Sequence, residues 1–191
     1  MGMPAQLERS WTADEVRREL LTEKAWPRYE LIDGDLIVTP SPTFAHNCLA
    51  KWLYDTLRDY LKREPVGEIM SAPSDLELRP GTISQPDLFV VPAAEFKGAR
   101  SWKDLGHLLL AVEVLSPRKA RYDRGIKRRH YQTAGVAEYW VVDPDARLIE
   151  RWRPGDARPE IIRERMAWHP TGASVALAFA LEELFSAAPS D

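Results

Sequence analysis

Two carboxylates interrupt apolar segments of this sequence, and their positions are the first indication of chemistry. Glu113 stands within the most apolar stretch of the chain, residues 108–115, and Asp87 directly precedes the apolar residues 88–91. Burying an ionised carboxylate is costly unless a cation or a metal ion lies beside it. Two acids on neighbouring strands can together hold Mg²⁺ or Mn²⁺ through oxygen ligands, and such an ion promotes hydrolysis of phosphodiester bonds. The two residues therefore predict a metal-dependent hydrolytic site.

Each acid also has an ordinary structural interpretation. Glu113 could point outward from a half-exposed strand or pair with an arginine. Asp87 follows Pro86 and could be a turn or capping residue, which is a common role for aspartate. The pair favours the site over these alternatives, because two acids beside one apolar core both need a positive partner.

A cluster of positive charge follows Glu113 in the chain. The formal net charge of −3 and the pI near 5.9 argue against a protein that coats nucleic acid with its whole surface. Within residues 118–129, however, seven basic side chains accompany a single acid, Asp123. Such a run is either a solvated helix face or a surface that contacts phosphates. The predicted contacts to nucleic acid are Arg121, Arg124, Lys127 and Arg128.

Helices are predicted in three places by capping residues and apolar spacing. A short helix begins at Thr12, whose side chain forms a capping box with Glu15, and ends before Pro27. Residues 43–63 carry apolar side chains at helical spacing and form a long amphipathic helix. Residues 121–134 form a third helix, which carries the basic cluster.

Strands account for most of the remaining chain. Residues 29–38 predict a hairpin that turns at Asp33-Gly34, a dipeptide that readily adopts positive φ angles. The stretch 108–115 is a central strand, and the strand at 139–142 follows it after a helix, so the two form a parallel βαβ unit. Short strands of an antiparallel meander are predicted at 68–70, 75–78 and 87–91, and edge strands with a short terminal segment at 148–152, 161–168 and 174–185.

Length and composition fit one domain covering residues 1–191. The chain is 45% hydrophobic and 29% charged, as in soluble globular proteins, and no apolar run approaches the roughly 20 residues of a membrane span. The single Cys48 cannot form an internal disulfide, and residues 1–10 lack the order of a secretory signal. We expect a cytoplasmic protein without membrane contact.

Several short motifs, taken in order, resemble the Uma-two family of endonucleases. They are SQPDL at 84–88, AVEVLSP at 111–117, YDRGIK at 122–127 and GVAEYWVVDP at 135–144, and YELIDG at 29–34 resembles the N-terminal hairpin of that family. The family is placed in the PD-(D/E)XK superfamily. The resemblance implies a restriction-endonuclease-like α/β core, with a twisted mixed sheet flanked by helices, and hydrolysis of phosphodiester bonds with Mg²⁺ or Mn²⁺.

The resemblance also implies roles for individual residues. Asp87 matches the acid of the PD element, and Glu113 matches the acid of the (D/E)XK element. The lysine position departs from the pattern, because Leu115 stands two residues after Glu113 and cannot polarise a phosphate. A lysine on the following helix is implied in its place, and this is Lys127.

Glu30 and Tyr131 complete the predicted catalytic set. Glu30 would be a third metal ligand beside Asp87 and Glu113, or it could pair with an arginine across the hairpin. Tyr131 lies four residues after Lys127 and therefore on the same helix face, although helix packing would equally explain it.

The predicted function is that of a metal-dependent endonuclease acting on nucleic acid, with DNA preferred to RNA. The displaced lysine also permits a nuclease fold that binds nucleic acid or a protein without cutting, and a phosphoesterase acting on small nucleotides is a third hypothesis. A homodimer is expected by analogy, since a duplex has two strands to cut. The histidines lack metal-ligand spacing and are interpreted as ordinary polar residues: His46, His107, His130 and His169.

Overall fold

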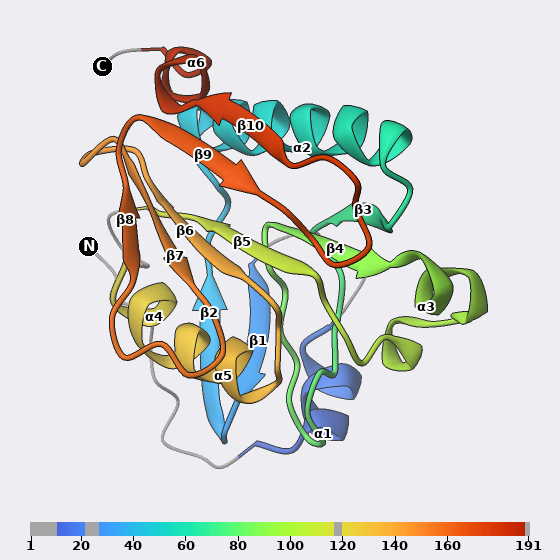
Figure 1. Ribbon diagram of the computed structural model, residues 1–191. Coiled ribbons are helices and arrows are strands. Elements are labelled where there is room, and N and C mark those ends of the chain that lie inside the picture. Colours follow the sequence, from blue (N-terminus) through green and yellow to red (C-terminus); the bar gives the residue numbers. More distant parts are fainter. Residues whose placement is uncertain (1–10, 22–26, 117–119, 190–191) are drawn as a thin grey trace.

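A six-stranded mixed sheet organises the molecule. The computed structural model describes residues 11–21, 27–116 and 120–189 (Figure 1). The strand order is β3-β4-β5-β6-β7-β8, in which only β5 and β6 run parallel among neighbours of this sheet. The strands are β3 (Gly67–Ser71), β4 (Leu88–Pro92), β5 (Leu110–Val114), β6 (Tyr139–Asp143), β7 (Leu148–Trp152) and β8 (Glu160–Ile162).

The parallel pair at the centre requires a crossover, and helical segments supply it. They are α4 (Ala120–Tyr122), a π-helical turn η2 (Asp123–Lys127) and α5 (Arg128–Thr133), and Gly135 with φ of 73° follows α5. This βαβ unit was predicted and is confirmed. The expected continuous helix over 121–134 is interrupted by η2, which has Gly125 at its centre, a poor helix former.

The long helix α2 (Phe44–Arg63) covers one face of the sheet, as Figure 1 shows. Its Leu49, Leu53 and Leu57 belong to the same buried cluster as Val112 and Trp140. The α6 helix (Leu181–Ser186) packs against α2 and follows a separate two-stranded sheet of β9 (Arg165–Trp168) and β10 (Leu177–Ala180). Of the helices in the described part of the chain, none combines the length and the apolar character that a bilayer span requires.

The opposite face of the sheet packs against the crossover helices. Alternate residues of a strand point to opposite faces, so Ala111 and Leu115 lie in a second buried cluster with Tyr131 and Val141. Glu113 shares the side of the strand on which Ala111 and Leu115 lie. A charged group is thereby carried to the interface between the sheet and α5.

A hairpin of β1 (Arg28–Ile32) and β2 (Asp35–Thr39) stands beside the crossover (Figure 1). Its turn has φ of 51° at Asp33 and 88° at Gly34, as predicted for a two-residue connection. Backbone hydrogen bonds in both directions between Leu31 and Ile83 attach the hairpin to the loop before β4. The hairpin is thus held where Glu30 can reach the sheet.

The first helix, α1 (Ala13–Glu19), has the predicted capping box between Thr12 and Glu15. Two shorter helical segments follow β4, namely α3 (Ala93–Gly98) and the 3₁₀ turn η1 (Trp102–Asp104). The predicted helix over 43–63 is confirmed by α2, whose N-cap is Thr43.

The structure corrects the predictions for four segments. Residues 75–78 form no strand, and there Leu76 makes an isolated bridge to Ser84. The 148–152 strand lies inside the sheet, because the polar Glu150 and Arg151 find charged partners and are buried at 8% and 9% exposure. The segments 161–168 and 174–185 each divide. Of their elements, β8 belongs to the main sheet, as the edge opposite β3, and β9, β10 and α6 lie outside it.

Gly67 allows β3 to approach its neighbour closely, which predicts a stability effect. A Cβ at this position would lie 2.7 Å from both Val90 Cγ1 and the Val91 carbonyl oxygen. We expect Gly67→Ala to lower the free energy of unfolding by about 1–3 kcal/mol, measured by urea denaturation, because the backbone oxygen cannot move aside easily. Gly98→Ala is the control, since its Cβ would meet nothing within 4 Å. Equal stability of the two variants would contradict the close approach.

Candidate active site

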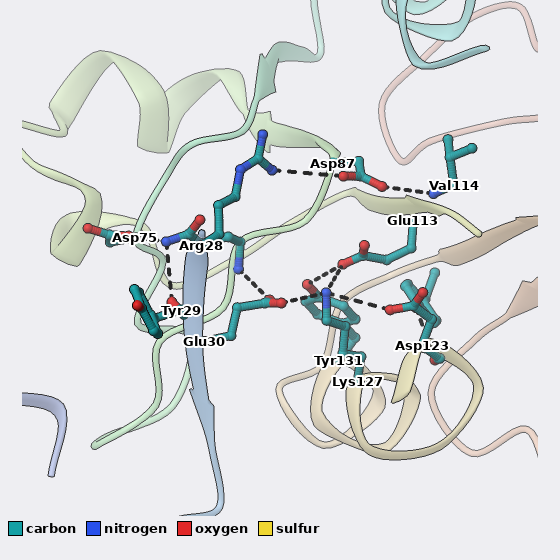
Figure 2. A network of polar contacts seen from close by, with 12 residues as sticks. Arg28, Tyr29, Glu30, Asp75, Asp87, Glu113, Val114, Asp123, Lys127 and Tyr131 are labelled. Carbon is teal, nitrogen blue, oxygen red and sulfur yellow. Dashed lines mark hydrogen bonds and ion pairs between the residues drawn. The ribbon is translucent and has the colours of Figure 1, made fainter. Parts of the chain in front are cut away.

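A buried ammonium group lies among three carboxylates where the hairpin, the sheet and the crossover meet (Figure 2). Lys127 Nζ is 2.7 Å from Glu30 Oε2, 2.9 Å from Glu113 Oε1 and 3.6 Å from Asp123 Oδ1. All four side chains are at most 2% exposed. Each acid comes from a different element, so the lysine joins β1, β5 and η2.

The backbone of Gln85 holds the carboxylate oxygen of Glu30 that does not contact Lys127. The Gln85 N–H donates to Glu30 Oε1 at 2.8 Å, and the Gln85 side-chain amide donates to Asp75 Oδ1 at 2.6 Å. Glu30 Oε2 meets Lys127. Both carboxylate oxygens of Glu30 are therefore engaged with protein groups.

Glu113 presents its two oxygens differently. Oε1 accepts from Lys127 Nζ and, at 3.4 Å, from the Tyr131 hydroxyl. Among the buried side-chain atoms of the described residues, Oε2 is one that accepts no hydrogen bond. A buried carboxylate oxygen without a donor is costly, and this oxygen can accept a ligand.

Asp87 lies beside this cluster, at the start of β4. Its Oδ2 accepts from the Val114 N–H at 3.0 Å and is 3.0 Å from His46 Nε2. Arg28 Nη1 is 3.9 Å from Oδ1, and Figure 2 shows the guanidinium directed at the carboxylate. Because Val114 follows Glu113 directly, its N–H places the two acids of the predicted pair side by side.

The balance of charge in the site is negative. Burial raises the pKa of Glu113 well above its ordinary value, although the Lys127 ammonium opposes the shift and the neighbouring acids reinforce it. Burial also disfavours the charged form of Lys127, but Glu113, Glu30 and Asp123 outweigh it and raise the pKa of the ammonium, which stays protonated. Even with Glu113 protonated, the three acids Asp87, Glu30 and Asp123 outnumber the cations Lys127 and Arg28, so the site favours one more cation.

A divalent ion is compatible with these residues. No group of three or more His, Cys, Asp or Glu side chains suited to a metal ion occurs in the described ranges. Mg²⁺ needs fewer, because it keeps several waters and is usually bound through one or two carboxylates together with substrate phosphates. Asp87 and Glu113 Oε2 provide such a pair.

The structure brings together the predicted catalytic residues Asp87, Glu113, Lys127, Glu30 and Tyr131. The predicted nucleic-acid contacts are distributed differently. Arg121 is exposed, whereas Arg124 is 2.6 Å from both Asp143 Oδ2 and Glu150 Oε1.

Two further cations of the basic run are engaged within the protein, and Arg118 and Lys119 lie outside the described residues. Arg128 donates to Gln132 Oε1 and lies 4.7 Å above the Trp152 ring, and Lys127 is buried. The interpretation of the run as a solvated face therefore holds for Arg121 and Arg129, which are exposed, and is wrong for Lys127.

Sequence reasoning missed four residues of the site. Asp123 had a usable signal, because it is the one acid of the basic run and precedes Lys127 by four residues. Arg28, His46 and Gln85 had none, since their partners lie far away in the chain. His46 and His130 were interpreted as ordinary polar residues, and the structure adds that both are buried, at 6% and 0% exposure, and that His46 meets Asp87.

Comparison with known families settles the relationship. A family model for Uma2, described as "Putative restriction endonuclease", matches residues 14–184. The chain belongs to the Uma2 family. Among curated proteins, no match was found.

A solved structure supports the same fold for this Uma2 family member. It is a crystal structure described as a putative nuclease belonging to DUF820 from Anabaena variabilis. The two chains are 23% identical with a TM-score of 0.73, and the alignment covers 93% of this chain and 98% of the other. The fold prediction, a mixed sheet flanked by helices as in restriction-endonuclease-like proteins, is confirmed, and Uma2 membership places the chain in a nuclease family.

The central ammonium predicts a large stability effect. Lys127→Met would leave Glu30, Glu113 and Asp123 buried without their cation, and we expect the free energy of unfolding at pH 7 to fall by about 3–5 kcal/mol. Glu113→Gln is the matched variant, because it keeps the Oε1 acceptor and removes one crowded charge; its change should stay below about 1 kcal/mol. Urea denaturation measures both. A Lys127→Met protein as stable as the wild type would show that the ammonium does not balance the acids.

His130 predicts a pH effect on stability. Burial and the nearby Arg79 lower the pKa of His130 to about 4 from its ordinary value of 6.5. The unfolded chain therefore takes up the proton first, and stability falls as pH drops from about 6.5 to about 4, by roughly 3 kcal/mol in total. His130→Leu should flatten urea-derived stability across this window, whereas His169→Leu, at an exposed position, should keep the wild-type slope. An unchanged slope in His130→Leu would remove this residue as the cause.

Proposed function

We propose that the protein is an endonuclease that hydrolyses phosphodiester bonds of nucleic acid, DNA in preference to RNA, with Mg²⁺ or Mn²⁺. The observation that carries the proposal is the pairing of Asp87 and Glu113 at adjacent strands, joined through the Val114 N–H, with Lys127 hydrogen-bonded to Glu113. Membership of a nuclease family supports the reaction class. A cytoplasmic location and a homodimer, with one subunit for each strand, belong to the same proposal.

Asp87 and Glu113 would hold the metal ion. When bound, such an ion lowers the pKa of a coordinated water and neutralises charge on the phosphate. Glu30 was also predicted as a ligand, but both of its oxygens are engaged by Gln85 and Lys127. We therefore assign Glu30 to holding the lysine.

Lys127 and Tyr131 act on Glu113 from the protein side. Both donate to Oε1, so Oε2 is the oxygen left for a metal ligand. The Val114 N–H and His46 hold Asp87 by its Oδ2 in the same way. The two carboxylates are thus oriented before any ligand arrives, which lowers the cost of binding and of catalysis.

A second candidate function is nucleic-acid binding without cleavage. It is favoured by the position of Lys127, whose ammonium lies among three carboxylates and is only 1% exposed. A lysine held in this way stabilises the substrate phosphate less directly than an exposed one would. Cleavage assays separate the two functions.

Asp87→Asn tests the catalytic proposal. The amide has the size of the carboxylate and can still accept from Val114, but it lacks the negative charge that a divalent ion requires. We expect nicking of supercoiled plasmid with Mg²⁺ or Mn²⁺ to fall about a hundredfold or more, equivalent to at least ~2.7 kcal/mol. Glu160→Gln is the control. Glu160 is an acid on β8 that pairs with Arg151 and Arg153, and its variant should cleave like the wild type.

Two outcomes would oppose the proposal. Wild-type cleavage by Asp87→Asn would remove this residue from the site. Absence of cleavage by the wild type on duplex DNA, single-stranded DNA and RNA with either metal would favour the binding function.

A further inference from the structure

A cleft with a volume of about 410 Å³ opens directly beside Asp87. Its walls are the first half of α2, the start of β1 and the ends of β3 and β4 that meet near the site. The described residues that line it are Arg28, Pro42, His46, Asn47, Ala50, Lys51, Tyr54, Ser71, Ala72, Asp87 and Leu88. Among these lining residues Asp87 alone is acidic, and the two cations Arg28 and Lys51 leave the cleft positive.

The α2 wall offers polar groups in a row. Asn47, Lys51 and Tyr54 are four and three residues apart, so they lie on one face of the helix. Lys51 pairs with Asp55 at 2.5 Å, but its side chain is 77% exposed. An ion pair in water contributes little, and a phosphate can replace the carboxylate at small cost. Arg58 lies 5.8 Å from the Tyr54 ring centre but pairs with Asp55 and Asp59, so Lys51 and Arg28 remain the cations of this cleft.

Arg28 connects this cleft with the acids of the site. Its side chain lines the cleft and is 13% exposed, and the guanidinium is directed at Asp87, with Nη1 3.9 Å from Oδ1 (Figure 2). A planar guanidinium has five donors and matches the geometry of a phosphate. A phosphate in the cleft would therefore meet a partly desolvated arginine within reach of the proposed metal ligands.

Other surfaces near the site are less suited to a phosphate backbone. A second cleft of about 740 Å³ also borders His46, but its Arg124 and Arg147 are balanced by Asp143 and Asp145. Arg124 is further committed to Asp143 and Glu150. Within the described residues 120–129, the basic run thus presents fewer available charges than its composition indicates.

We propose that the cleft beside Asp87 is the phosphate-binding subsite, in which Arg28, with Lys51 and Asn47 along α2, holds the backbone of the substrate strand. The inference rests on the proposed function and assigns the substrate path to α2 instead of the basic run 118–129. The substrate strand of nucleic acid then reaches Asp87 and Glu113 from the side on which Arg28 lies.

The test compares two double variants that remove equal charge. Arg28→Gln with Lys51→Gln alters the cleft, and Arg121→Gln with Arg129→Gln alters the exposed cations of the basic run. Binding of a fluorescein-labelled DNA duplex of about 20 base pairs is measured by fluorescence anisotropy at several salt concentrations. EDTA is present so that no cleavage occurs. The cleft variant should bind at least about tenfold more weakly at 0.1 M salt, with the slope of log K against log salt reduced by about two. The run variant should match the wild type.

Further variants guard against a folding defect. Arg28 is partly buried, so its variants are compared with the wild type by thermal melting. If Arg28→Gln melts substantially lower, the exposed Lys51→Gln alone carries the test and should reduce the slope by about one. Arg28→Lys should keep the slope but lose affinity, because it retains the charge and loses the planar fork.

Each outcome has a distinct meaning. A cleft variant that binds like the wild type, or a run variant that takes the loss in its place, overturns the subsite while plasmid cleavage still supports the nuclease. Salt-dependent binding that is lost in the cleft variant, in a protein that does not cleave, supports the subsite and opposes the nuclease. A wild type that binds no nucleic acid overturns both.

Discussion

The ammonium of Lys127 is the interaction on which the arrangement of the site depends. It lies within 3.6 Å of carboxylates from the hairpin β1–β2, the central strand β5 and the turn η2. Without it the three buried acids would lose the cation that they share, and an unpaired charge in the interior costs several kcal/mol. One cation therefore lets three elements place acids in a common interior. The remaining excess of negative charge makes this interior suited to a metal ion.

Strand alternation and the crossover connection bring these side chains together. Alternation along β5 directs Glu113 to the crossover face while Val112 and Val114 pack on the side of α2. The parallel pairing of β5 with β6 forces the chain to cross over that same face, which carries Lys127 and Tyr131 to Glu113. The backbone N–H of Val114, next in the chain, then orients Asp87. Val112 and Val114 thus pack on one side of β5, while Glu113 faces the crossover on the other side, between the buried Ala111 and Leu115.

Local signals allowed much of the fold to be predicted. The Asp33-Gly34 turn, the Thr12 cap and the apolar spacing of α2 each depend on neighbouring residues alone. Strand β7 was predicted as an edge strand. It lies inside the sheet, because its charged residues Glu150 and Arg151 pair with charged groups elsewhere in the chain.

The site could be predicted in part for the same reason. A carboxylate in an apolar run, such as Glu113, is visible in the sequence, whereas Lys127 was singled out by family resemblance. The arginines 124 and 128 show their charge in the sequence but not their partners. Likewise, the contact of His46 with Asp87 joins residues 41 positions apart, and no pattern of spacing encodes it.

The contacts of the site differ in how far apart their residues lie along the chain. Glu113 and Lys127 are 14 residues apart and belong to one βαβ unit, whereas Glu30 is fixed by Gln85 across 55 residues. Closing the longer loop costs more chain entropy, and contacts of this kind tend to form late in folding. The crossover unit can therefore form with its lysine facing only Glu113 and Asp123, and docking of the hairpin then adds Glu30 and seals the ammonium from water. Completion of the candidate site is in this way coupled to the docking of the hairpin, so a molecule in which the hairpin has not docked lacks Glu30 beside Lys127.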